Sequence, residues 1–244
     1  MGTVRFALPA FAVILFCSIA PHAPSIPAPG LILWAWERPE DLRFIDPATT
    51  GVAYLGATLD LQADGSARFH FRQQPLRLPP NVSLIAVVRI ESPPRYVLPQ
   101  PAEIAAGLTQ IAMRQDVKAL QIDYDARASE RGFYRALLAE LRKKTDLPTG
   151  ITALASWCDG DRWLSGEPLS EAVPMFFRMG KGESKNMPIN AIACHTSIGL
   201  STDEAWPRRR PAGLSEHARI YVFNPHPWTQ ADYEAVVRQM AEWK

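Results

Sequence analysis

The feature that most constrains the fold is the segment 117–127, whose sequence is VKALQIDYDAR. Its apolar first half is typical of a β-strand buried on both faces, and a helical pattern follows from residue 129 to about residue 144. Asp123 and Asp125 come where this strand ends, and side-chain alternation directs both carboxylates to one side. In parallel α/β folds, the C-terminal ends of the strands hold the active site. The segment therefore predicts a strand–helix unit with paired acids at a site, although either acid could instead cap the helix or pair with Arg127.

Further apolar runs alternate with helical patterns along the chain. The segments expected to be strands are 31–36, 52–59, 83–90, 117–123, 150–156, 189–193 and 219–223, with 68–72 as a hairpin arm. The segments expected to be helical are a helix start at 39–42, then 101–114, 129–144, 170–179 and 229–243, the last with Thr229 as its N-cap. Strands joined by helical crossovers imply a parallel sheet.

About seven such strands in 244 residues predict an α/β fold, namely a (β/α) TIM-like barrel that is compact or incomplete. An open doubly wound sheet is the alternative. The segments expected to be parallel in one closed or nearly closed sheet are Leu31–Trp36, Ser83–Ile90, Val117–Asp123, Gly150–Ser156 and Arg219–Phe223. No GxGxxG or GxxxxGK(S/T) pattern follows the first strand, so no nucleotide cofactor is expected.

The first 29 residues are expected to precede the single barrel domain, which would occupy residues 30–244. The apolar segment Phe6–Ala20 is shorter than the about 20 residues that a membrane span needs, which favours a secretory signal peptide. An uncleaved N-terminal anchor is the alternative. Residues 21–29 (PHAPSIPAP) predict an extended Pro-rich linker. The protein is therefore expected to be exported, either periplasmic or anchored to the inner membrane, with no other membrane contact.

Charge and motif content exclude several other classes of function. The net charge of +1 offers no basic field for nucleic acid. The five histidines show no HxxxH or HExxH spacing, and no GxSxG pattern is present, so neither a zinc site nor a serine hydrolase is indicated. No metal is expected, with an oxygen-ligated Mg²⁺ or Ca²⁺ on Asp123, Asp125 and Asp161 as the alternative.

Aromatic and acidic residues gather at the ends of the predicted strands. Flat aromatic rings beside carboxylates suit a carbohydrate groove, although several of the seven tryptophans could simply fill the barrel. The residues predicted to be catalytic are Asp123, Asp125 and Glu37, with Asp125 or Glu37 as the acid and Asp123 as its partner. The residues predicted to bind substrate are Trp34, Trp36, Tyr124, Arg127, Trp157, Asp161, Trp163, Asn224 and Trp228.

The short sequence IDYDAR at residues 122–127 resembles part of the DGIDxDxE strand of family 18 chitinase-like glycoside hydrolases. In that family the strand is the fourth of a barrel, and its final Glu protonates the leaving group. The resemblance places Ile122, Asp123 and Asp125 on the motif, while Arg127 stands at the position of the acid and Leu120 at that of the first Asp.

A longer resemblance covers nearly all of residues 31–228. It runs through the segments LWAWERPEDLRF, QIDYDARASERGFYRALLAELR, ITALASWCDGDRWL, EAVPMFFRMG and SIGLSTDE. These segments resemble the bacterial family known as domain of unknown function 3142, which is similar to barrel glycosidases. The resemblance implies the barrel and leaves the reaction open.

Two functions are therefore expected. The first is an exported glycoside-hydrolase-like barrel that acts on a cell-envelope or extracellular glycan through carboxylates at the strand ends. The second is a non-catalytic barrel that binds a glycan or a protein. A glycan or polysaccharide is the expected partner, and nucleic acid is not.

Cys158 and Cys194 are the two cysteines outside the N-terminal segment. Both are expected at the ends of consecutive parallel strands, which lie about 4.7–4.9 Å apart. That spacing falls within the Cα separation of about 4.4–6.8 Å that a disulfide allows. An oxidising compartment would let them form a disulfide, and two buried free thiols are the alternative.

Overall fold

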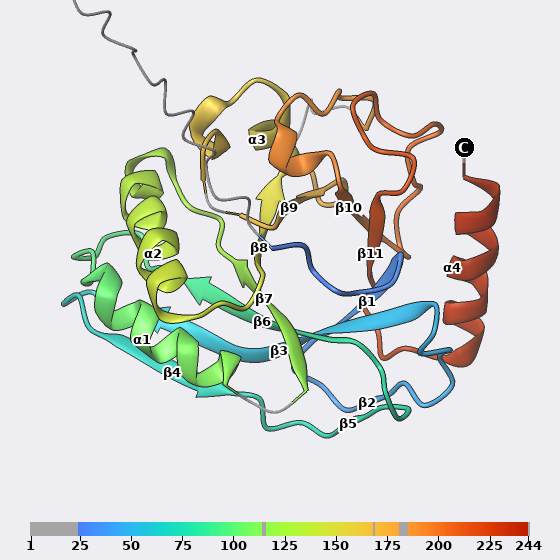
Figure 1. The fold of residues 1–244 in the computed structure, drawn as a ribbon, viewed down its shortest axis with the longest axis horizontal. Coiled ribbons are helices and arrows are strands. Elements are labelled where there is room, and N and C mark those ends of the chain that lie inside the picture. The colour runs from blue at the N-terminus through green and yellow to red at the C-terminus, as the bar shows by residue number, and fades with distance from the viewer. Residues whose placement is uncertain (1–23, 114–115, 168, 181–184, 244) are drawn as a thin grey trace, which may run out of the picture.

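The computed structural model describes residues 24–113, 116–167, 169–180 and 185–243. Eight parallel strands in this part of the chain form a closed barrel (Figure 1). They are β1 (Leu31–Ala35), β3 (Thr50–Leu61), β6 (Leu84–Glu91), β7 (Val117–Asp123), β8 (Thr149–Leu154), β9 (Glu171–Met175), β10 (Ser197–Ser201) and β11 (Arg219–Phe223). Their order is β1-β11-β10-β9-β8-β7-β6-β3, and the pairing of β1 with β3 closes the ring. The closure confirms an α/β barrel and excludes the open doubly wound sheet.

Helices cover the outside of the barrel. Helices α1 (Pro101–Ala112) and α2 (Arg131–Lys144) lie on one side, and α4 (Gln230–Glu242) lies on the other (Figure 1). The N-cap of α4 is Thr229, as predicted, because its hydroxyl accepts the N–H of Asp232 at 3.2 Å. The remaining elements are β2 (Glu40–Asp41), β4 (Ala67–Phe71), β5 (Leu76–Arg77), α3 (Ala155–Asp159) and the 3₁₀ turns η1 (Ala128–Glu130), η2 (Arg162–Leu164) and η3 (Ile192–Cys194).

The five segments expected to share one parallel sheet all belong to the barrel. They correspond to β1, β6, β7, β8 and β11. The predicted hairpin arm is β4, which pairs antiparallel with β3. Two segments have another type of structure than expected: residues 155–156 begin α3 instead of extending β8, and residues 40–41 form β2 instead of a helix start.

The helix predicted for residues 170–179 is wrong, because this segment contains β9. Pro174 lies inside the strand, where proline removes a hydrogen-bond donor. The N–H of Phe176 donates to the carbonyl of Gly199 on β10. Because backbone groups two residues apart in a strand point the same way, the nitrogen of Pro174 also faces β10. On that side β9 and β10 share a single register pair, Gly199 with Met175, so the missing donor costs little.

The strand predicted for residues 189–193 is also wrong, and the true strand, β10, was not predicted. The N–H groups of Asn190 and Ala191 bond to the carbonyl of Cys158 at 2.7 and 3.0 Å, not to a neighbouring strand. Strand β10 has the sequence SIGLS, whose glycine and serines are poor strand formers. Gly199 is required there because a β-carbon at this position would lie 2.9 Å from the Trp34 ring.

Residues 24–29, the described part of the expected extended linker 21–29, pack against the barrel. Ile26 is buried and belongs to the apolar cluster that fills the barrel interior with Ile32, Ile85 and Val173. The predicted signal or anchor segment, residues 6–20, lies outside the described residues. Within the described residues, no helix is long and apolar enough to cross a membrane.

A buried ion pair joins two strands at the N-terminal end of the barrel. Glu171, the first residue of β9, lies 2.5 Å from the guanidinium of Arg219, the first residue of β11. The hydroxyl of Tyr221 also donates to Glu171. Arg219 in turn donates to the carbonyls of Ile26 and Pro29, at 3.0 and 3.2 Å. The network therefore binds the segment before β1 to the bottom of the barrel.

Cys158 and Cys194 form a disulfide with a Cα–Cα distance of 6.0 Å, which confirms the predicted bridge. They do not lie on adjacent strands as expected. Cys158 is in α3, after β8, and Cys194 is in η3, before β10. The bridge therefore joins two connecting segments whose described residues form no long helix.

Loss of this bridge should lower the stability of the protein measurably. We expect the Cys158→Ser/Cys194→Ser variant to have a free energy of unfolding lower by about 3 kcal/mol, because the unfolded chain is no longer cross-linked. Denaturant unfolding measures the change, and reduced wild-type protein is the matched control. Mass spectrometry under non-reducing conditions should find neither thiol free, and two free thiols in the folded protein would contradict the bridge.

Candidate functional site

A pocket of about 550 Å³ opens at the C-terminal ends of the barrel strands, where parallel barrels carry their active sites. The residues that line it are Trp34, Trp36, Arg38, Arg89, Asp123, Asp125, Thr152, Leu154, Ala155, Met175, Phe177, Arg178, Met179, Gly180 and Phe223. The structure thus brings together four residues that the sequence singled out: Asp123, Asp125, Trp34 and Trp36.

One wall of the pocket carries Asp123 and Asp125, here called the β7 carboxylates. Asp123 is the last residue of β7, and Asp125 follows two positions later, so both side chains reach the pocket. Asp123 accepts a hydrogen bond of 2.6 Å from the hydroxyl of Thr152 on β8. It also stands next to Arg89 in the register of β6 with β7. The acids are therefore flanked by one hydroxyl and one guanidinium.

Burial raises the pKa of both β7 carboxylates above the ordinary value for aspartate. For Asp123 the hydrogen bond from Thr152 opposes this effect on the pKa, while the charge of Asp125 adds to it. Asp125 lies at the pocket rim, and burial raises its pKa against the opposing charge of Arg89. Raised pKa values in two different environments suit a pair in which one carboxyl keeps its proton and the other ionises.

The facing wall is aromatic. Phe177 stacks on Phe223 with centroids 5.6 Å apart and planes inclined by 4°. Trp34 contacts Phe177 at 6.1 Å, and Trp36 contacts Phe223 at 6.2 Å, so the four rings are continuous. In the ring order β11 lies opposite β7, which places this wall across the pocket from the β7 carboxylates. A hydrogen bond of 2.8 Å from the Trp34 indole to Gln121 holds Trp34 in place.

Glu37, predicted to be catalytic, is not among the residues that line the pocket. Its carboxylate accepts the backbone N–H groups of Gln73 and Gln74 at 2.8 and 3.1 Å. Glu37 therefore holds the chain after β4. Its neighbour Trp36 points to the pocket, and consecutive side chains in extended chain point to opposite sides.

Tyr124 and Arg127 also lie outside the pocket. Tyr124 stands between the β7 carboxylates in sequence, so it faces the outer layer, where its hydroxyl donates to Glu130 at 2.9 Å. Arg127 pairs with Glu130 at 3.2 Å and donates to the carbonyls of Pro93 and Pro94. The position that carries the acid in chitinase-like sequences is thus directed away from the pocket, and Arg127 does not pair with a β7 carboxylate.

Trp157, Trp163 and Asp161, predicted to bind substrate, pack in the outer layer. The two indoles meet edge to face at 4.8 Å in the apolar core. Asp161 pairs with Arg131 at 2.6 Å and so does not join the β7 carboxylates in a cation site. In the part of the chain that the structure describes, no group of three or more His, Cys, Asp or Glu residues could hold a metal ion.

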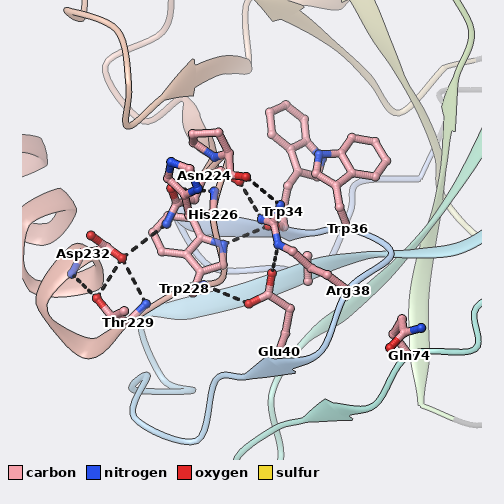
Figure 2. A network of polar contacts seen from close by, with 12 residues as sticks. Trp34, Trp36, Arg38, Glu40, Gln74, Asn224, His226, Trp228, Thr229 and Asp232 are labelled. Carbon is pink, nitrogen blue, oxygen red and sulfur yellow. Dashed lines mark hydrogen bonds and ion pairs between the residues drawn. The ribbon is translucent and has the colours of Figure 1, made fainter.

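Asn224 and Trp228 do not line the pocket and belong to a polar network with Arg38 and Glu40 (Figure 2). Arg38 pairs with Glu40 at 2.6 Å and donates to the carbonyl of Asn224 at 2.6 Å. The backbone N–H of Trp228 donates to Glu40 at 2.9 Å, and its indole donates to the carbonyl of Trp34 at 2.9 Å. These bonds brace the end of β1 and the chain after it, which carry the aromatic residues of the pocket.

Several pocket residues were not predicted from the sequence. They are Arg38, Arg89, Thr152, Phe177, Arg178 and Phe223. Arg89 and Phe223 stand at the ends of correctly predicted strands, so alternation along those strands is a signal that could have found them. Phe177 and Arg178 were missed because residues 170–179 were interpreted as a helix.

Comparisons of the chain with protein-family models, with curated proteins and with solved structures found no match. The pocket itself is therefore the basis for the function inferred below.

Proposed function

We propose that the protein binds a glycan in this pocket and hydrolyses a glycosidic bond, with Asp125 as the general acid and Asp123 as its carboxylate partner. The observation that carries the proposal is the pair of β7 carboxylates, whose pKa values burial raises, facing a continuous aromatic wall. Glycoside hydrolases need two carboxyl groups at the scissile bond, one of them protonated at working pH.

The surroundings of the two acids support this division of roles. The Thr152 hydroxyl donates to Asp123, and a hydrogen bond of this kind stabilises the ionised carboxylate. Asp125 is exposed at the pocket rim. In the described residues no hydrogen-bond donor contacts it, so partial desolvation raises its pKa with only the charge of Arg89 in opposition. Asp125 can then protonate the glycosidic oxygen of the leaving group. Asp123 either deprotonates the water that attacks the anomeric carbon, or attacks that carbon itself to form a glycosyl-enzyme that water then hydrolyses. Sugar rings can stack on the aromatic wall opposite.

We also propose that the barrel is TIM-like and that the protein is exported. A TIM-like barrel with few long helices in the described residues is in keeping with the resemblance to barrel glycosidases and to domain of unknown function 3142. The apolar N-terminal segment supports export, so a polysaccharide of the cell envelope or of the surroundings is the substrate that we propose.

A non-catalytic glycan-binding barrel is the second candidate function. One observation favours it: both pocket carboxylates come from the end of a single strand, while Glu37 and Arg127 are bonded elsewhere. Such a barrel would keep the aromatic wall for binding and release no product.

Release of reducing ends from bacterial envelope polysaccharides separates the two candidates. We expect wild-type protein to release them and the Asp125→Asn variant to fall to background, because the proton donor is lost. Asp146→Asn is the matched control, since Asp146 is exposed and precedes β8 at the opposite end of the barrel. Binding of a polysaccharide by wild-type protein with no release of reducing ends would replace the hydrolase with the binding barrel.

A further inference from the structure

The pocket contains three arginines beside the two β7 carboxylates: Arg38, Arg89 and Arg178. Arg38 is engaged by its ion pair with Glu40 and by the carbonyls of Asn224 and Pro225. The charges that remain for a ligand are therefore those of Arg89 and Arg178. Burial also raises the pKa of each β7 carboxylate, which reduces the negative charge that would repel an anion.

Arg178 is held over the aromatic wall with its guanidinium 4.9 Å from the centre of the Phe223 ring. The nearby carboxylate of Glu204 is already occupied. It accepts the backbone N–H of Arg178 at 2.8 Å and pairs with Lys185 at 2.8 Å. Across the described residues, the guanidinium of Arg178 has no carboxylate partner. A ring beneath a guanidinium fixes its plane and leaves its N–H edge available.

The backbone of Arg178 adds a second observation. Its φ angle is 51°, in the left-handed region that residues with a side chain rarely adopt. Such conformations concentrate at ligand sites, where the surrounding structure holds them in place. Here the bond from its N–H to Glu204 holds the backbone, and the side chain is directed over the wall of the pocket.

Arg89 occupies a similar position over another ring of the aromatic wall. Its guanidinium lies 6.0 Å from the centre of the Trp36 ring. It pairs with Glu91 at 3.0 Å, and both side chains are about half exposed, so water screens this ion pair. Arg89 also neighbours Asp123 in the strand register. The charge of Arg89 is thus shared between Glu91 and Asp123, so Arg89 is the weaker of the two anion contacts.

We propose that the glycan taken by this pocket is acidic, with a carboxylate on the sugar that Arg178 binds and Arg89 assists. This inference rests on the proposed glycan function and specifies its substrate class. A planar guanidinium matches a carboxylate through two parallel N–H···O bonds, and the adjoining rings accept the apolar face of the same sugar. Neutral glycans would leave the Arg178 guanidinium without an anion.

Matched probes that differ only in charge test the inference. We would titrate tetrasaccharides of alginate, polygalacturonate and hyaluronate calorimetrically, each against its carboxyl-reduced neutral form. In at least one pair we expect the acidic form to bind about tenfold more tightly, since a charge-assisted pair contributes about that much. Arg178→Gln should remove the preference by lowering the affinity for the acidic form to that for the neutral form. Arg238→Gln, which alters net charge equally on the exposed face of α4, should leave the preference intact.

The outcomes separate this inference from the proposed function. Equal affinity for acidic and neutral forms in every pair, or a preference that survives Arg178→Gln, overturns the acidic-glycan inference. Release of reducing ends from neutral glycans alone also overturns it and leaves the hydrolase proposal standing. A preference for the acidic form that depends on Arg178, with no cleavage of any glycan, supports the inference and overturns hydrolysis. Binding of none of the probes overturns the inference. A circular dichroism melt of each variant confirms that it is folded.

Discussion

Replacing Glu171 by glutamine is expected to lower the free energy of unfolding by about 3–5 kcal/mol, the usual effect of removing one partner from a buried ion pair. The side chain of Glu171 is 1% exposed and bonds to Arg219 and to the hydroxyl of Tyr221. An amide cannot neutralise the guanidinium, which is itself 17% exposed. The carbonyls of Ile26 and Pro29 would still accept from Arg219, but they carry no charge that balances the guanidinium at the bottom of the barrel.

Denaturant unfolding of Glu171→Gln measures this change. Glu140→Gln is the matched control, because Glu140 pairs only with Lys143 on the surface of α2 and its loss should matter little. The variant with Glu171→Met and Arg219→Met together should be less destabilised than Glu171→Gln, since it leaves no buried charge. A loss below about 1 kcal/mol for Glu171→Gln would show that water reaches the pair.

Replacing Asp123 by asparagine is expected to reduce the proposed hydrolysis by about 10²–10⁴-fold, as loss of a group that works by proton transfer does. Activity requires Asp123 ionised and Asp125 protonated. It should therefore fall as pH decreases through the pKa of Asp123 and as pH increases through the raised pKa of Asp125. The rate of reducing-end release against pH measures both limits.

Two variants shift these limits in directions that the contacts determine. Thr152→Val removes the hydrogen bond that lowers the pKa of Asp123, so the acidic limit should move to higher pH. Arg89→Gln removes the charge that lowers the pKa of both β7 carboxylates, so the acidic and the alkaline limits should both move to higher pH. A profile unchanged by both substitutions would assign the proton transfers to other groups.

The sequence by itself was sufficient where the signal is local. The apolar run of residues 117–123 predicts β7, because a strand buried on both faces admits few polar residues. Alternation directs Asp123 and Asp125 to one side, and both line the pocket. The Thr229 cap of α4 is equally local, since its hydroxyl bonds to a backbone group only three residues away. Five parallel strands could be placed in one sheet by the same reasoning.

The arrangement of β9 and β10 was decided by tertiary contacts. The run from Ala172 to Phe177 fits a helix or a buried strand, and only its pairing with β8 selects the strand. Gly199 weakens the local strand signal of β10, but it is needed because the Trp34 ring, from the other end of the chain, packs against it. Contacts between residues so far apart in sequence leave no local pattern.

The functional roles of individual side chains also depended on the tertiary structure. Glu37, Arg127 and Trp163 have the chemistry of site residues, yet each meets a partner in the outer layer that sequence spacing does not reveal. Arg178 reaches the pocket through a left-handed backbone that no residue type in its neighbourhood predicts. The end of a strand fixes the position of the backbone. The partners available around each side chain then decide whether it points to the pocket or to the core.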